Sequence, residues 1–290
     1  MTPAQVAFFN KKPERYFGVN YFLRPFFGSH PSRQYFSTTA DIDPVYHEDH
    51  VAVAHERIPL ILDKLASLES GMIVGFSQNP DPYDPALTEE QPMETLLGTI
   101  RDKKLGLYLE TANEGLIRDL PLIQQIKEKA PVIVTVPIGF ANDQIQQVII
   151  PKEPIFAKKL RLIAKLAAEG INVGTLLKPI IPFVNDNEAH LIEIIEKAKQ
   201  AGTCFIYPSF GINLNSSQHR MFMDFVMRNL PGLRNIYMDH FGFKKSWASP
   251  KLKLLKKTFV INMKKNKLPF GMKEIISGLV SEKVVQLKLF

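Results

Sequence analysis

The sequence is most informative in what it lacks. Its single cysteine, Cys204, excludes an internal disulfide and any metal site built from several thiolates. No apolar run approaches the roughly 18 residues that a membrane-spanning helix needs, and the first residues lack the uninterrupted apolar core of a signal peptide. We therefore expect a cytoplasmic protein.

Acidic residues are also missing from residues 244–267, a stretch rich in lysine. The whole chain carries a net charge of +7. Lysine gains affinity for polyanions because it releases counterions condensed on phosphates. The stretch indicates either a solvated amphipathic helix or a surface that faces nucleic acid, and DNA is the partner we expect for this C-terminal region.

Short apolar runs alternate along the chain with segments of helical spacing. Continuous apolar runs are typical of parallel strands covered on both faces. The predicted strands are 21–26, 71–76, 105–109, 131–138, 172–181 and 203–207. The predicted helices are 55–68, 89–101, 114–129, 154–169 and 188–200.

This alternation predicts an α/β fold, a (β/α)6 TIM-like barrel that is partial or complete. A doubly wound open sheet is the alternative. We assign residues 1–248 to the barrel and residues 249–290 to a basic helical C-terminal extension and tail. In both architectures, functional residues lie at the carboxyl ends of the strands.

Several phrases spread over nearly the whole chain carry a family resemblance. They include FGVNYFLRPFFG, NPDPYDP, GLIRDLPLIQQI, KLAAEGINVGTLLKPIIPFVND and GTCFIYPSFGINLN, in this order. The chain resembles radical S-adenosylmethionine proteins of the branch similar to spore photoproduct lyase. The resemblance implies a radical S-adenosylmethionine barrel, a 4Fe-4S cluster, S-adenosylmethionine as cofactor and a lyase acting in DNA repair.

In that family the loop after the first strand reads G-C-x-x-x-C-x-Y-C, and its three thiolates bind three irons of the cluster. Here Gly28 matches the glycine and Tyr35 the aromatic residue, whereas Ser29, Arg33 and Phe36 occupy the cysteine positions. Thiolates hold iron–sulfur clusters, with rare histidine replacements. Serine is a poor, high-pKa ligand, and arginine and phenylalanine offer no ligand atom. We therefore expect a degenerate protein, a pseudoenzyme without cofactor.

Histidines could supply a different metal site. His30 lies in the same loop, and His47, His50 and His55 follow it. Their spacing fits no zinc motif, so we expect them to be solvated rather than metal-bound.

The resemblance also implies positions that contact S-adenosylmethionine. Asp81 and Tyr83, in a proline-rich turn, match residues that help to hold its amino end, and Tyr35 matches an adenine contact. Where the relatives carry a Thr-Lys-Ser phrase, this chain has Thr111, Ala112 and Asn113, and we count Thr111 among the cofactor-binding positions. The alternative is a proline-fixed turn whose aspartates cap the following helix.

Other family positions have changed as well. The Glu-Pro phrase before the fourth helix is read here as Ile150-Pro151, and the arginine that follows it as Lys159. Losses at strand ends beside a preserved scaffold are the pattern expected when packing is kept and radical chemistry is not.

The last five residues, QLKLF, resemble the peptide with which replication and repair proteins bind the bacterial sliding clamp. Gln286 would form hydrogen bonds, and Leu287, Leu289 and Phe290 would supply apolar anchors in an extended segment. The alternative is a tail that folds back on the barrel.

Two functions follow from these observations. The first is a non-catalytic member of the family that associates with DNA. The alternative is an active radical S-adenosylmethionine enzyme of the lyase type, acting on nucleic acid with a 4Fe-4S cluster whose ligands are unrecognised. A weaker third hypothesis is a metal- or base-dependent enzyme that reuses the barrel mouth.

Overall fold

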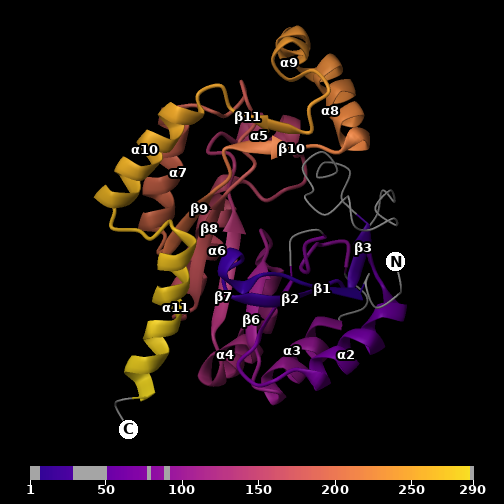
Figure 1. The fold of residues 1–290 in the computed structure, drawn as a ribbon, viewed down its shortest axis with the longest axis vertical. Coiled ribbons are helices and arrows are strands. Elements are labelled where there is room, and N and C mark those ends of the chain that lie inside the picture. The colour runs from indigo at the N-terminus through magenta and orange to yellow at the C-terminus, as the bar shows by residue number, and fades with distance from the viewer. Residues whose placement is uncertain (1–6, 29–50, 77–79, 88–91, 288–290) are drawn as a thin grey trace.

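A seven-stranded, mostly parallel sheet forms the centre of the molecule (Figure 1). The computed structural model describes residues 7–28, 51–76, 80–87 and 92–287. The strand order is β1-β2-β5-β6-β7-β8-β9; only the β1–β2 pair is antiparallel. The strands are β1 (Phe8–Asn10), β2 (Val19–Leu23), β5 (Ile73–Phe76), β6 (Gly106–Glu110), β7 (Val132–Pro137), β8 (Asn172–Leu177) and β9 (Phe205–Pro208). A separate pair, β3 (Phe26–Gly28) and β4 (Val51–Val53), is antiparallel.

The crossover helices pack against one face of this sheet, which we call the outer face. Its largest apolar cluster joins strand residues such as Leu107, Val134 and Val173 to helix residues such as Leu97 and Ile194. The helices are α2 (Ile58–Ser67), α3 (Pro92–Asp102), α4 (Leu120–Lys129), α5 (Asp143–Ile149), α6 (Phe156–Ala168) and α7 (Glu188–Gln200), with 3-10 turns η1 (Pro13–Arg15), η3 (His55–Arg57) and η4 (Glu114–Asp119).

The opposite, inner face carries the alternate residues of the same strands, because side chains alternate along a strand. It is covered by aromatic rings rather than by crossover helices. Phe17 stacks on Tyr108 and on Phe205, with ring centroids 5.5 Å apart in both pairs. Ile275 and Leu279 of helix α11 (Met272–Leu287) complete this cluster.

This arrangement confirms the predicted α/β fold with a mostly parallel sheet. Crossover helices on one face are typical of a barrel rather than of a doubly wound sheet. Within the described residues, however, the strand order starts at β1 and ends at β9, so the sheet is open. The six predicted strands overlap the six parallel strands β2 and β5 to β9.

A smaller layer stands above the end of the sheet (Figure 1). It has its own apolar cluster, in which Trp247 stacks on Phe241 at 4.8 Å and lies 5.0 Å from Tyr237. Its elements are β10 (Gly211–Asn213), α8 (Ser216–Asn229), η5 (Pro231–Leu233), α9 (Arg234–Phe241) and β11 (Ser246–Ala248).

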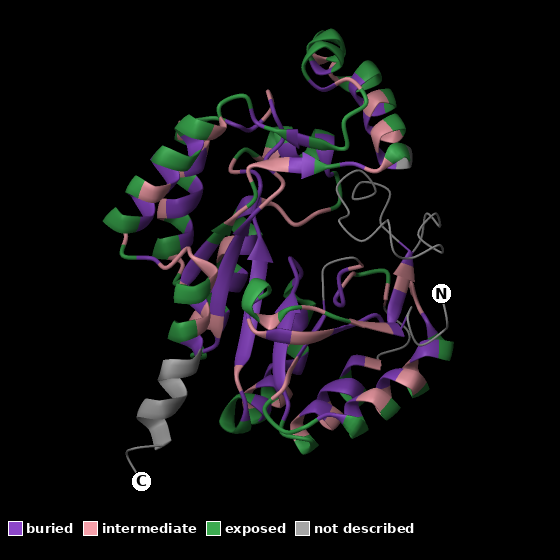
Figure 2. Cartoon of the chain, viewed as in Figure 1, coloured by how far each residue is buried: buried purple, intermediate pink, exposed green. Residues whose placement is uncertain are grey.

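Helix α10 (Leu252–Lys265) packs along α7 and is amphipathic. Leu255, Phe259 and Met263 are buried, while its lysines face solvent (Figure 2). The division at residue 249 stays a prediction. Among the described residues, no helix has the length and apolar character needed to cross a membrane.

Gly174 on β8 tests the packing of the inner face. A Cβ atom there would lie 2.1 Å from the ring of Phe205, so Gly174→Ala should lower the free energy of unfolding by about 1–3 kcal/mol. Gly98 on α3 is the matched control. Nothing lies within 4 Å of a Cβ there, and Gly98→Ala should stabilise the protein by about 0.5–1 kcal/mol. Urea unfolding followed by circular dichroism measures both values; equal stabilities would contradict this packing.

Candidate functional site

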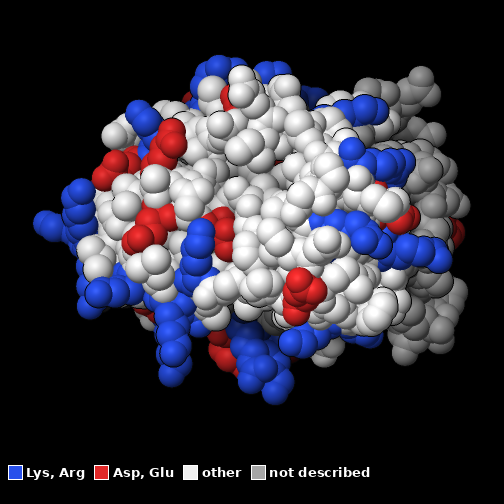
Figure 3. Space-filling view, turned by 90° about the horizontal axis from the view of Figure 1, so that it is seen from above, with Lys and Arg blue, Asp and Glu red and all other residues white. Residues whose placement is uncertain are grey.

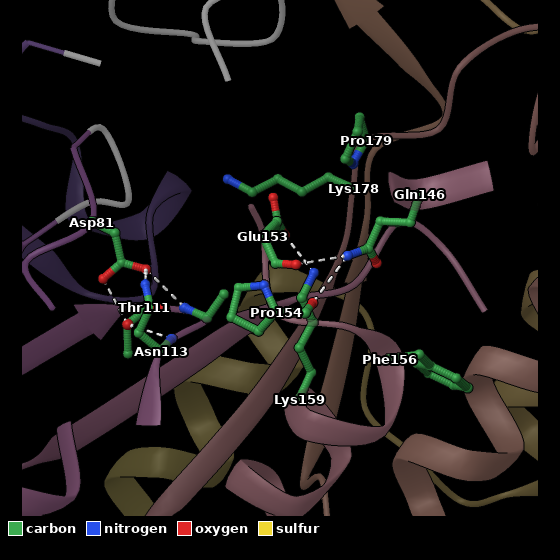
Figure 4. Close-up of polar contacts among 12 residues, drawn as sticks. Asp81, Thr111, Asn113, Gln146, Glu153, Pro154, Phe156, Lys159, Lys178 and Pro179 are labelled. Carbon is green, nitrogen blue, oxygen red and sulfur yellow. Dashed lines mark hydrogen bonds and ion pairs between the residues drawn. The ribbon is translucent and has the colours of Figure 1, made fainter. Parts of the chain in front are cut away.

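A buried carboxylate joins the loop after β5 to the carboxyl end of β6 (Figure 4). Asp81 is 1% exposed. Its Oδ1 accepts hydrogen bonds from the Thr111 hydroxyl at 2.7 Å and the Tyr83 amide at 2.9 Å. Its Oδ2 accepts from the Ala112 amide and the Asn113 side-chain amide, both at 2.9 Å. Three of these hydrogen bonds fix the loop to the residues that follow β6, and the fourth, from the Tyr83 amide, lies within the loop.

Tyr83 and Thr111 are buried beside this carboxylate. Burial raises the pKa of the Tyr83 phenol well above its usual range, and the nearby Asp119 carboxylate raises this pKa further. The Thr111 hydroxyl also accepts a hydrogen bond from the Asn113 amide at 3.0 Å. These contacts fix the position of the loop after β5 relative to the carboxyl end of β6.

The sequence prediction thus brought together three residues that do lie together. A carboxylate offers about four acceptor positions, and Asp81 uses four within the protein. Asp81 therefore has a structural role, but these four partners lie in its own loop and after β6 rather than in the following helix, so they are not the helix cap of our alternative. A cofactor contact by Asp81, Tyr83 or Thr111 stays a prediction. Tyr35 lies outside the described residues.

A second buried ion pair joins Glu153, in the loop before helix α6, to Lys159 within that helix. Lys159 is 1% exposed, and its ammonium contacts the carboxylate of Glu153. Gln146 of α5 donates from Nε2 to the backbone carbonyls of Glu153 and Pro154, at 3.2 and 3.0 Å. Figure 4 shows these side chains converging.

The placement of the relatives' Glu-Pro phrase at Ile150-Pro151 stays a prediction. Glu153-Pro154, three residues further on, supplies the carboxylate that pairs with Lys159. Sequence reasoning did not single out Glu153. The buried cation at Lys159 is therefore paired, as burial of a charge requires.

A third ion pair spans the inner face between β6 and the end of β8. Lys178 Nζ lies 2.6 Å from Glu110 Oε1. Tyr108, two residues before Glu110, is buried, and burial raises the pKa of its phenol well above the usual range, with a further contribution from Glu110. The Thr135 hydroxyl donates to the Tyr108 oxygen at 2.9 Å. Sequence reasoning singled out neither Glu110 nor Lys178.

The donor set does not fit the cluster that the family resemblance implies. Cys204 directly precedes β9, at the amino end of that strand, and its amide donates to the Val173 carbonyl at 2.8 Å. The family loop follows the carboxyl end of a strand, which is the opposite edge of a parallel sheet. One thiol at the wrong edge cannot replace three thiolates.

The remaining metal predictions fall mostly outside the described residues. Ser29, Arg33, Phe36, His30, His47 and His50 lie there. His55 begins η3 and is exposed. In the described part of the chain, no group of three His, Cys, Asp or Glu side chains has the geometry to hold a metal ion.

The fold is similar to that of solved radical S-adenosylmethionine enzymes. A spore photoproduct lyase variant with bound AdoMet and dinucleoside spore photoproduct aligns with a TM-score of 0.57 and 13% identity, over 90% of this chain and 76% of that one. The radical S-adenosylmethionine methyltransferase TsrM from Kitasatospora setae aligns with a TM-score of 0.50 and 10% identity, over 84% of this chain and 52% of TsrM. The chain therefore shares the fold of these two enzymes.

Sequence comparison finds only uncharacterized relatives among curated proteins. Proteins of Mycobacterium bovis and Mycobacterium tuberculosis are 26% identical over 166 residues, 57% of this chain and 48% of each relative. A protein of Acidianus two-tailed virus is 27% identical over 114 residues, 39% of this chain and 36% of the relative. The chain spans about half the length of the mycobacterial relatives. No family model matches it.

The substitution Asp81→Asn tests the contribution of the hydrogen bonds that the Asp81 carboxylate accepts. The asparagine would place an NH2 group where one carboxylate oxygen of Asp81 now accepts hydrogen bonds, so buried donors would lose their acceptor. The free energy of unfolding should therefore fall by about 2–3 kcal/mol. Asp84→Asn is the matched control, because Asp84 accepts a hydrogen bond from the exposed Ala86 amide and should contribute little. Chemical denaturation compares the two variants; an unaffected Asp81→Asn protein would contradict the structural role.

Proposed function

We propose that this chain is a radical S-adenosylmethionine-fold protein that has lost its cluster and acts as a DNA-associated binding protein. The observation that carries this proposal is the ligand inventory, since Cys204 is the only thiol of the chain. Its place at the amino end of β9 supports the same conclusion. The residues aligned with the cluster cysteines, Ser29, Arg33 and Phe36, cannot form thiolate bonds to iron.

The lysine-rich stretch supports the DNA-associated part of the proposal. Helix α10 buries its apolar side, so its lysines extend into solvent. In Figure 3, basic side chains lie mainly around the margins of the face seen from above. The exposed lysines of the stretch are Lys244, Lys245, Lys251, Lys253, Lys256, Lys257, Lys264, Lys265 and Lys267.

The C-terminal motif adds a proposed partner, the bacterial sliding clamp. Helix α11 includes Gln286 and Leu287, and Leu289 and Phe290 lie outside the described residues. The support is therefore the motif itself, a Gln followed by apolar anchors of the kind that peptide-binding grooves accept.

The alternative is an active lyase-type enzyme that binds a 4Fe-4S cluster and S-adenosylmethionine. Its support is the fold shared with spore photoproduct lyase, which has been solved with AdoMet bound. Fold similarity at 13% identity does not carry the chemistry, because the reaction depends on ligands that this sequence replaces. The two functions differ in whether the chain binds iron.

Anaerobic reconstitution with iron and sulfide separates the two functions. The wild-type chain should bind almost no iron and show no charge-transfer absorption. The triple variant Ser29→Cys, Arg33→Cys and Phe36→Cys restores the family spacing and is the positive control; it should gain iron. About four irons per wild-type chain would establish the alternative enzyme instead.

DNA binding is tested by its salt dependence. Lys253→Gln, Lys256→Gln and Lys257→Gln together should weaken binding and flatten the plot of log K against log salt by roughly 0.9 for each lost phosphate contact. A control triple removes three other lysines outside the stretch, Lys152, Lys158 and Lys165. Fluorescence anisotropy with a labelled duplex measures both proteins. Equal slopes for the two triples would contradict a role for α10.

The tail is tested by deleting residues 286–290. Binding to a purified bacterial clamp should disappear, whereas the thermal midpoint should stay nearly unchanged because terminal residues make few packing contacts. Lys288→Ala is the control, since the motif assigns no contact to that side chain. An unaltered binding curve after the deletion would refute the clamp proposal.

A further inference from the structure

A hollow of about 460 Å³ lies on the inner face of the sheet, near the ends of β6, β8 and β9. Its volume falls in the range of small-molecule sites. Aromatic side chains dominate its walls, and they come from the N-terminal segment as well as from the strands. The rings are those of Phe9, Tyr16, Phe17, Phe22, Tyr108 and Tyr207.

These rings are held in fixed positions by one another. Phe9 and Phe22 stack with centroids 5.5 Å apart and planes 16° from parallel. Phe17 stacks on Tyr108 at 14° and meets the ring of Tyr207 edge-on at 5.5 Å. Phe17 adopts a left-handed backbone with φ of 53°, an unfavourable conformation for a bulky residue that the surrounding packing maintains. Preformed aromatic walls favour a flat ring as ligand.

The charges around the hollow favour an anion. Lys178 is neutralised by Glu110. Lys11 lies over the rings of Phe9 and Tyr16, 5.1 and 4.8 Å from their centroids, and Arg15 lines the same hollow. Within the described part of the chain, Lys11 and Arg15 form no ion pair, so the lining of the hollow carries two uncompensated positive charges.

We propose that this hollow binds a nucleoside monophosphate, with its base between the aromatic walls and its phosphate on Lys11 and Arg15. A phosphate carries close to two negative charges at neutral pH and accepts charge-assisted hydrogen bonds from both side chains. S-adenosylmethionine fits this charge pattern poorly, because its sulfonium centre is a cation. The site is a small-molecule site, distinct from the proposed DNA surface on α10.

Isothermal titration of the full chain with adenosine 5′-monophosphate tests the proposal. The nucleotide should bind at one saturable site, and Lys11→Gln or Arg15→Gln should each weaken it about tenfold or more, since each removes a hydrogen bond to a charged group. Lys12→Gln is the matched control, because Lys12 is exposed and does not line the hollow. Its affinity should equal that of the wild type.

Titration with other ligands shows which chemical groups of the nucleotide the hollow recognises. Adenosine and inorganic phosphate should each bind at least tenfold more weakly than the nucleotide, and indole-3-acetate should be intermediate because it carries one charge. The triple lysine variant of α10 should bind the nucleotide normally, which separates this site from the DNA surface. Absence of nucleotide binding, equal binding by Lys11→Gln and Lys12→Gln, or tighter binding of S-adenosylmethionine would overturn the proposal.

Discussion

Burial of both faces of the central sheet is the constraint on which the rest of the structure depends. Crossover helices cover the outer face, and the rings of Phe17, Phe22, Tyr108 and Phe205 cover most of the inner face. The N-terminal segment and helix α11 thus occupy space inside the curve of the sheet. Because these groups pack at van der Waals distances, the strand ends are held in fixed positions, and so are the polar side chains that follow them.

The polar groups at the strand ends are mostly paired within the protein. Asp81 binds β6, Lys159 pairs with Glu153, and Lys178 pairs with Glu110. Such pairs avoid the cost of an isolated buried charge. Paired in this way, these charged groups can stay buried at the strand ends and in the adjoining helix. A fold that rests on packing can persist without the ligands on which a reaction depends, which is the basis of the proposed loss of the cluster.

The sequence predicted the parallel strands well because each is a continuous apolar run, and it predicted crossover helices from their spacing. It missed β1 and the placement of Phe17, since a three-residue strand has no detectable period and long-range ring stacking leaves no local pattern. Asp81, Tyr83 and Thr111, which the resemblance assigned to one cofactor site together with Tyr35, lie side by side in the structure. Their contacts could not be predicted, because the direction of a carboxylate depends on donors from a strand about 30 residues away. Sequence reasoning did not single out Glu153, because its ion pair with Lys159 becomes visible only once the loop before α6 is folded.

The central claim is that this radical S-adenosylmethionine fold has no means of holding a cluster. Electron paramagnetic resonance of the anaerobically purified, dithionite-reduced chain tests that claim most directly. The account predicts a silent spectrum from wild-type protein. A signal of a reduced 4Fe-4S centre, integrating to about one spin per chain, would contradict it.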